Sequence, residues 1–349
     1  MRGLLAFAVL VMAIGAWAQE VRSFKQHNMQ QWGIPAGNYS GIAHIEGERY
    51  ALISDKQTAD GWTEVSIRFL PSGDIDRMTF IAHHYDSHSQ GKARDSEGIA
   101  YVPGRGFFVC AESDQSILEL SEDGTPTGSS LDVPKGFSTK DIFPNYGFEA
   151  LTFDAERNLF WTTTEQGLRS DVASATTLSS PSPTLLRLQS FGSDLRPLLQ
   201  FAYATEAPAT HRASGRLVFG VPELLALDDT SLIVMERELI IPKRYNRAKC
   251  SIRLFCVNPL TAHAIADPSL PLRETDADAF LPKKPLYTFS TGIRLFGKKN
   301  LANYEGMCLG PRLADGRQTL LLVSDSQNRA GNSLFRLKDY IKVVVIKSN

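Results

Sequence analysis

Five short segments of the sequence share one pattern, and four of them carry a glutamate at its second position. In each, that position is followed by a small or apolar residue and then by alternating apolar positions. The segments cover 39–43 (YSGIA), 96–100 (SEGIA), 148–152 (FEALT), 222–226 (PELLA) and 304–308 (YEGMC). The repeated acids are Glu97, Glu149, Glu223 and Glu305, with Ser40 in the first segment. Carboxylates gathered in a partly desolvated space repel one another, so they either take up protons or hold a cation.

The chemistry of these acids favours a hard divalent cation. Several carboxylate oxygens suit Ca²⁺ better than a softer metal. No set of histidines repeats, and no cysteine spacing is typical of a zinc site. We therefore predict that Glu97, Glu149, Glu223 and Glu305 bind Ca²⁺. An architectural role, in which each glutamate accepts backbone N–H groups from a neighbouring unit, stays open.

A second apolar stretch follows each segment after a polar turn, and it too ends at an acid. These stretches cover 50–54, 107–111, 159–163, 231–235 and 320–324. The acids that follow them are Asp55, Glu112, Glu165, Glu236 and Asp325. Whether this second set of acids joins the cation site is left open.

Further strand-like stretches complete each unit, and no long helical periodicity lies between them. Third strands are predicted at 64–70, 116–120, 184–188, 251–257 and 333–337, and fourth strands at 78–82, 198–203 and 286–289. Antiparallel four-stranded units repeated in this way indicate an all-β protein with a β-propeller fold. Five units are clear, and a sixth blade is left open. Residues 21–29 are predicted to close the ring beside the last unit, which ends in 341–346.

Basic residues lie in the connections that lead to the glutamate segments. Arg94, Lys140 and Lys298 precede Glu97, Glu149 and Glu305, and Arg212 and Arg216 precede Glu223. A cation beside such residues suits an anionic substrate, so Arg94, Lys140 and Lys298 are predicted to bind one. For His83, His84 and His88, in the first of these connections, general acid–base chemistry, a three-histidine metal cluster and an ordinary polar loop all stay open. No Gly-x-Ser-x-Gly elbow and no phosphate-cradling glycine loop occurs.

The overall charge and the first residues of the sequence bear on the protein's partners and on its location. Of 349 residues, 43% are hydrophobic and the formal net charge is -1, so a nucleic-acid partner is not expected. Arg2, the apolar run 4–14 and the Ala-Trp-Ala ending at Ala18 are typical of a secretory signal peptide covering 1–18. We expect one monomeric domain over 19–349, secreted or periplasmic, with no later membrane span.

Cys250 and Cys256 lie too far apart on one strand to pair, and Cys110 and Cys308 are expected to be buried thiols.

Several of these segments together resemble a known family. The stretches 95–101 (DSEGIAY), 147–152 (GFEALT) and 303–307 (NYEGM), with 232–237 and 322–328, are similar to the phytase-like family ("esterase-like activity of phytase") of secreted bacterial proteins. The resemblance covers about 37–338 and departs from the pattern at Ser40. It implies a propeller and a Ca²⁺-dependent phosphoesterase or esterase. For hydrolysis by metal-activated water we predict that Glu149 and Glu97 are the catalytic carboxylates.

Two other functions stay open beside this one. The local Asp-x-Glu-Gly-Ile-Ala pattern at 95–100 also resembles Ca²⁺-dependent gluconolactonase-like propellers, in which the cation polarises a lactone carbonyl. The third is a propeller without catalysis that binds a glycan or a protein partner, because a fold does not by itself give a function. The residues leave open whether the protein is an enzyme.

Overall fold

The alternating apolar residues form strands along nearly the whole described chain. The computed structural model describes residues 21–347 apart from 90, 92, 211–213, 228–229, 244, 295 and 333–334. The predicted signal peptide at 1–18 therefore lies outside the described residues. Within the described part the only helical elements are short 3-10 turns, so the protein is all-β as predicted. None of its described helices has the length and apolar character needed to cross a bilayer.

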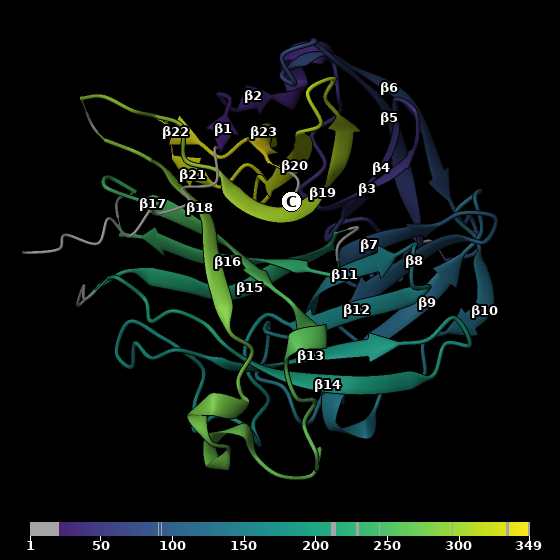
Figure 1. The fold of residues 1–349 in the computed structure, drawn as a ribbon. Helices are drawn as coiled ribbons and strands as arrows, with labels where there is room; N and C mark the ends of the chain where they lie inside the picture. The colour runs from purple at the N-terminus through teal and green to yellow at the C-terminus, as the bar shows by residue number, and fades with distance from the viewer. Residues whose placement is uncertain are drawn as a thin grey trace, which may run out of the picture.

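Four blades are continuous in sequence, and each is an antiparallel sheet of four strands paired in chain order (Figure 1). Blade 1 comprises β3 (Tyr39–Glu46), β4 (Arg49–Ser54), β5 (Gly61–Phe69) and β6 (Ile75–Tyr85). Blade 2 comprises β7 (Ser96–Val102), β8 (Gly106–Ala111), β9 (Ser116–Leu120) and β10 (Pro126–Ser130). Blade 3 comprises β11 (Phe148–Asp154), β12 (Leu159–Thr164), β13 (Leu185–Phe191) and β14 (Pro197–Ala204). Blade 4 comprises β15 (Arg216–Ala226), β16 (Leu232–Ile241), β17 (Lys249–Val257) and β18 (Lys283–Gly292).

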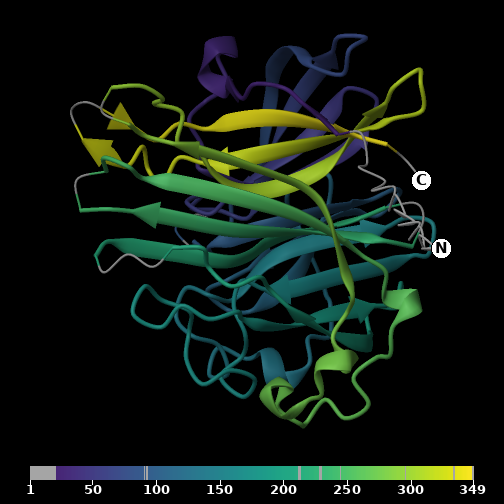
Figure 2. The same cartoon turned by 60° about the vertical axis from the view of Figure 1, so that its left-hand side comes forward.

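Blade 5 combines the two ends of the described chain. Its strands β19 (Asn303–Arg312), β20 (Gln318–Asp325) and β23 (Tyr340–Ile346) pair in that order. The N-terminal strands β1 (Arg22–Ser23) and β2 (His27–Asn28) then pair with β23 on its outer side. The prediction that residues 21–29 close the ring is thus confirmed, and the fold is a five-blade propeller. Figure 2 shows the first and last parts of the chain meeting in this blade.

One predicted strand is wrong. Residues 333–337 were expected to form the third strand of the last blade, but β23 pairs directly with β20 and takes that place. Instead, β21 (Gly331–Asn332) and β22 (Phe335–Arg336) form a small separate hairpin. The reason is burial. Residues 341–346 are buried and apolar except for Lys342, a pattern that fits an inner position, whereas the 326–339 connection is more polar. The predicted loops 170–183 and 259–282 contain no strand, and the second holds η3 (Pro259–Thr261), η4 (Leu272–Glu274) and η5 (Ala277–Ala279).

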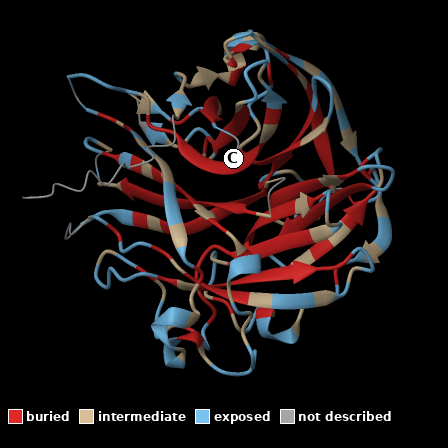
Figure 3. Cartoon of the chain, in the orientation of Figure 1, coloured by how far each residue is buried: buried red, intermediate tan, exposed pale blue. Residues whose placement is uncertain are grey.

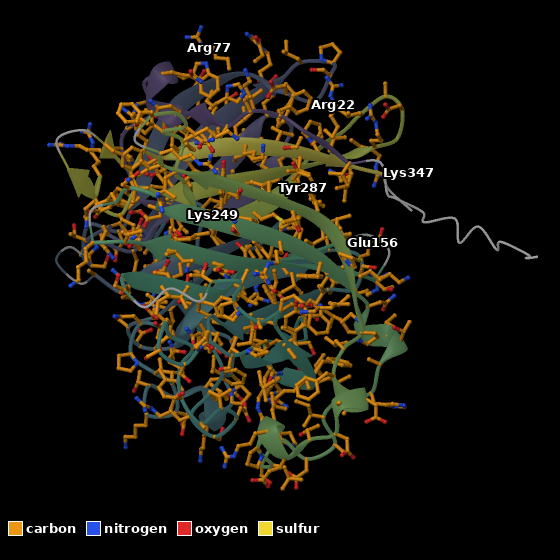
Figure 4. The ribbon with its side chains drawn as sticks, turned by 90° about the vertical axis from the view of Figure 1, so that its left-hand side faces the viewer. Arg22, Arg77, Glu156, Lys249, Tyr287 and Lys347 are labelled. Atoms are coloured by element: carbon orange, nitrogen blue, oxygen red, sulfur yellow. The ribbon has the colours of Figure 1, made fainter. Side chains whose placement is uncertain are left out.

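The core consists of apolar clusters between neighbouring blades. Separate clusters fill the contacts of blades 1 and 2, 2 and 3, 3 and 4, 4 and 5, and 5 and 1. Buried residues accordingly concentrate on the inner strands, and exposed ones on the outer strands and loops (Figure 3). Lys249 and Tyr287, for example, lie on the outer strands β17 and β18 (Figure 4). This sequential packing closes the ring and brings the starts of the five inner strands together.

Close backbone approach explains why a small residue follows most of the repeated glutamates. A Cβ on Gly98 would lie 2.6 Å from the carbonyl oxygen of Glu149 in the next blade. A Cβ on Gly306 would lie 2.7 Å from the Cα of Gly41 across the closing interface. The inner strands therefore touch at this level, just inside the position of the acids.

Candidate metal centre

A β-bulge sets the repeated position at the start of the inner strand in four of the five blades. In blade 3, Phe148 pairs with Thr164 and Ala150 with Thr163, so Glu149 is the bulged residue. Glu305 in blade 5 and Ser40 in blade 1 occupy the same place, and Glu97 lies within the corresponding bulge of blade 2. Because a bulge re-aims one side chain and bends its strand, it places these side chains alike in each blade.

Blade 4 departs from this register by one residue. Gly220 pairs with Arg237 and Glu223 with Met235. In blade 5 the corresponding pairs are Asn303 with Asp325 and Gly306 with Val323. Pro222 therefore occupies the bulge position in blade 4, and Glu223 occupies the position of the small residue that follows it. Glu223 therefore does not occupy the strand position of Glu97, Glu149 and Glu305, although the sequence pattern predicted that it would.

Glu223 is held by backbone amides. Its Oε1 accepts hydrogen bonds from the amides of Leu151 at 3.1 Å and Leu224 at 3.0 Å. The side chain is buried, and its Oε2 has no partner among the described residues. Burial raises the pKa of Glu223 well above the ordinary value, although the amides of Leu224, Leu151 and Met307 oppose the shift. This environment matches the architectural role left open by the sequence.

The shift of register also changes the second set of acids. Asp55, Glu112, Glu165 and Asp325 end the second strands of their blades, but Arg237 takes the equivalent position in blade 4. Glu236, adjacent to Arg237, points to the opposite face of the sheet. There its Oε1 accepts a hydrogen bond from the Tyr203 hydroxyl at 2.6 Å and contacts Lys283 Nζ at 2.8 Å.

Arg237 neutralises one side of the acidic ring. Its guanidinium, only 2% exposed, forms ion pairs with Glu165 and with Glu305. It also donates to Asn303 Oδ1 at 3.1 Å, and the Asn303 amide donates to Glu305 Oε1 at 2.6 Å. Glu305 and Glu165 therefore have a permanent cationic partner inside the protein.

Three other acids of blades 2 and 3, Glu97, Glu112 and Glu149, form no ion pair with a cationic side chain among the described residues. Glu97, Glu112 and Glu149 each offer a carboxylate oxygen, and these three atoms lie within 4.8 Å of one another. All three residues are buried. The Gly147 amide donates to Glu112 Oε1 at 2.8 Å, whereas no donor among the described residues reaches the carboxylates of Glu97 or Glu149. This group of oxygens is suited to bind a hard cation.

The pKa values show how unfavourable the charged, metal-free state is. Burial raises the pKa of Glu97 well above the ordinary value, and the charges of Glu149 and Glu305 add to the shift. Burial and the charges of Glu165 and Glu112 do the same to Glu149. Burial raises the pKa of Glu112 to about 7, even though the Gly147 amide opposes it. The cluster therefore holds protons near neutral pH unless a cation replaces them.

A second group of acids adjoins the first. Asp55, Asp95 and Glu97 also place one carboxylate oxygen each within 4.8 Å of the others. Lys56 forms ion pairs with Asp55 and with Asp95, the latter at 3.3 Å. Sequence analysis assigned no role to Asp95, Lys56 or Arg237. The signal available was the charged residue next to each repeat, namely Asp95 before Ser96-Glu97 and Lys56 after Asp55.

The predicted substrate-binding residues differ in how they are held. Arg94 is mostly buried and forms ion pairs with Asp114 at 3.0 Å and Asp60 at 3.2 Å. Lys140 and Lys298 are exposed, in the connections that lead to β11 and β19. Of the other basic residues, Arg216 is exposed at the start of β15, and Arg212 lies outside the described residues.

The histidines at 83–88 belong to blade 1 and not to the acidic centre. His83 and His84 lie on the outer strand β6, where His83 Nδ1 is 3.0 Å from Thr63 Oγ1 and His84 Nε2 is 2.8 Å from Glu64. His84 also stacks on Trp62, and His88 is exposed beside Asp86. Neither of the groups of acids that could hold a metal ion, among the described residues, includes a histidine.

Comparison with known proteins gives one family. A family model described as "Phytase-like: Esterase-like activity of phytase" matches residues 34–327. No curated protein matches the chain.

Solved structures similar in fold include an endo-arabinase from Bacteroides thetaiotaomicron, with 12% identity, a TM-score of 0.45 and coverage of 92% of this chain and 96% of that one. An α-L-arabinanase from Penicillium chrysogenum has 12% identity, a TM-score of 0.40 and coverage of 92% and 98%. A streptogramin B lyase has 11% identity, a TM-score of 0.35 and coverage of 94% and 98%. At this level of similarity these structures say nothing about the activity of this chain.

Proposed function

The chain belongs to the phytase-like family, and on that premise we propose that it is a secreted, Ca²⁺-dependent hydrolase of a phosphate ester or another ester. The observation that carries the proposal is the group formed by Glu97, Glu112 and Glu149, whose oxygens lie within 4.8 Å of one another and which forms no ion pair with a cationic side chain among the described residues. Secretion is proposed from the predicted signal peptide at 1–18.

The residues present fit a hard divalent cation. All donors are carboxylate oxygens, which Ca²⁺ prefers, and none is a thiolate or an imidazole. The neighbouring Asp55 Oδ1 is buried and has no hydrogen-bond partner among the described residues. In the proposal Glu97, Glu112 and Glu149 hold the ion. Glu223 and Glu305, which were also predicted as ligands, are held instead by backbone amides and by Arg237.

The chemistry proposed divides between the ion and the chain. When bound, Ca²⁺ would supply the positive charge that polarises the scissile group and acidifies a water. Glu149 and Glu97 are the proposed catalytic carboxylates, because no donor among the described residues reaches either one. Glu112, whose Oε1 is fixed by the Gly147 amide, would serve as a ligand that the bound ion holds deprotonated.

An anionic substrate would meet positive charge around this centre. We assign that role to Arg94, Lys140 and Lys298. Arg94 is held in place by Asp60 and Asp114, so its orientation is fixed before the substrate arrives. Lys140 and Lys298 are exposed and free to reorient, so they would act as point charges.

A substrate panel tests this proposal. The purified chain would be assayed on a phosphomonoester, an inositol phosphate, an acyl ester and a sugar lactone, with excess Ca²⁺ and with chelator. The proposal predicts Ca²⁺-dependent release of phosphate or acid, lost in Glu149→Gln and retained in the control Glu156→Gln. Glu156 is exposed at the turn after β11 (Figure 4), at the opposite end of that strand from Glu149.

The alternatives give different outcomes. Opening of the lactone alone would favour the gluconolactonase-like function. No turnover of any substrate, together with specific retention on a glycan or protein array, would favour a binding propeller and overturn the hydrolase.

A further inference from the structure

The acids of this centre extend toward blade 1 into a second set of ligands. Asp55 follows β4, Asp95 precedes β7 and Glu97 lies in β7. Their oxygens approach one another as closely as those of the first group. Glu97 belongs to both groups, so the two sets of oxygens share a carboxylate.

Lys56 lies within this second group. Its Nζ forms ion pairs with both Asp55 and Asp95. The Lys56 side chain is 45% exposed, so it has an open route away from the acids into solvent. Arg237, by contrast, is only 2% exposed and has no such route.

The ammonium group leaves part of the site unsatisfied. Asp55 is 8% exposed, and its Oδ1 has no hydrogen-bond partner, while Lys56 contacts its Oδ2. A Ca²⁺ ion takes six to eight oxygens and accepts a carboxylate through one or both of its oxygens. It would therefore satisfy an atom that the single ammonium group leaves without a partner.

We propose that Asp55, Asp95 and Glu97 form a second divalent-cation position, which Lys56 fills as a tethered counter-cation until an ion displaces it. This rests on the proposed function only in that Glu97 is shared with the first position. The two positions fill in order, because the ion at the second must expel a charged side chain and the ion at the first need not. Lys56 thereby sets the Ca²⁺ concentration at which the second position fills.

Calorimetric titration of the chelator-treated protein with CaCl₂ tests the proposal. Wild type is compared with Lys56→Met, which keeps an apolar stem of similar length but lacks the charge. Lys284→Met, at an exposed lysine of β18, is the control for loss of a positive charge. We expect Lys56→Met to bind a second Ca²⁺ at least about tenfold more tightly than wild type does. Lys284→Met should match wild type.

A second substitution locates the added site. Asp95→Asn in the Lys56→Met background should remove the gained binding event and leave the first one. Equal numbers and affinities of ions in wild type and Lys56→Met would overturn the proposal, and so would a gain that survives Asp95→Asn. A circular-dichroism spectrum of each variant checks that it is folded.

This experiment separates the inference from the proposed function. Absence of turnover on every substrate, with the gain in Lys56→Met intact, would overturn the hydrolase and leave the second position standing. Ca²⁺-dependent turnover, with equal Ca²⁺ binding by wild type and Lys56→Met, would support the hydrolase and overturn the second position. No Ca²⁺ binding by any variant would overturn both.

Discussion

Blade 4 and blades 1 to 3 fill the same positions of the propeller with opposite charges. In the middle of β16, at the position that corresponds to the acids following the second strands of the other blades, blade 4 carries Arg237, where the others carry Asp55, Glu112 and Glu165. At the bulge it carries Pro222, where blades 2 and 3 carry Glu97 and Glu149. The repeat therefore fixes where side chains lie but not what charge they bear.

This difference divides the acidic ring into two halves. On the side of Arg237, Glu165 and Glu305 have a buried partner that cannot leave. On the other side, Lys56 is the one cation among the described residues that forms an ion pair with the acids. Because buried charge is unfavourable unless it is paired, the first half is structural and the second has to take protons or an exchangeable cation. The following predictions test that division.

The largest effect is expected on the structural side. Arg237→Met would leave Glu165 and Glu305 buried without their cation. We expect this to lower the free energy of unfolding by about 3–5 kcal/mol, the range for removing one partner of a buried pair. Urea unfolding followed by circular dichroism measures the loss.

An exposed ion pair provides the control. Arg68 contacts Asp76 at 2.7 Å, and both side chains are well exposed. Arg68→Met should therefore cost at most about 1 kcal/mol. Equal losses in the two variants would mean that Arg237 does not neutralise its half of the ring.

A smaller effect is expected on the exchangeable side, where Ca²⁺ should stabilise the folded protein. Binding at about 100 times the dissociation constant adds about 2.7 kcal/mol, seen as a rise in melting temperature. Glu149→Gln should abolish most of this rise. Without Ca²⁺ the same variant should be at least as stable as wild type, because its neutral side chain needs no proton to relieve the repulsion between the acids.

Glu223→Gln is the matched variant outside the predicted site. Gln keeps an oxygen for the amides of Leu151 and Leu224, and its neutral side chain matches a protonated Glu223. Its response to Ca²⁺ should equal that of wild type. A response lost in Glu223→Gln and kept in Glu149→Gln would reverse the division drawn here.

The smallest effect is a dependence of stability on pH. Burial raises the pKa of Glu112 from 4.5 to about 7, so the folded state binds its proton more tightly than the unfolded state does. The stability that this proton contributes is present in full below about pH 4.5 and is lost as the pH rises to about 7.

Melting temperatures in chelator measure this loss. The fall between about pH 5 and about pH 7.5 should be larger in wild type than in Glu112→Gln, which is neutral throughout. Saturating Ca²⁺ should remove the difference in slope, because the ion holds Glu112 deprotonated. Identical slopes for wild type and Glu112→Gln in chelator would show that Glu112 does not titrate in this range.

The fold could be predicted from the sequence because the pattern that indicates its strands is repeated. The period-2 apolar stretches recur in every unit, so the four-stranded blades and the closing role of residues 21–29 were predictable. The exception, 333–337, lies in a connection next to a more apolar strand, and pairing with β20 selected the more apolar of the two. In a chain of similar strands such competition is settled by burial against neighbours.

The site could be predicted from the sequence only in part, because the position of each acid in its strand depends on where a β-bulge falls. Pro222-Glu223-Leu224 has the letters of the repeat, but it lacks the small residue that follows the acid in Glu97-Gly98 and Glu305-Gly306. Close contact between inner strands requires that small residue, so its absence was the available sign of a shifted register. Lys56 was less accessible, because only the folded chain shows that it lies between Asp55 and Asp95.

The central claim is that Glu97, Glu112 and Glu149 of blades 2 and 3 hold a divalent cation. A crystal structure of the Ca²⁺-soaked protein, with anomalous scattering used to identify the ion, tests it most directly. We predict an ion with carboxylate oxygens of Glu97, Glu112 and Glu149 at about 2.3–2.6 Å, the usual Ca²⁺–oxygen distance. Density for an ion held by Glu223 or Glu305 instead, or no ion at these acids in saturating Ca²⁺, would contradict the claim.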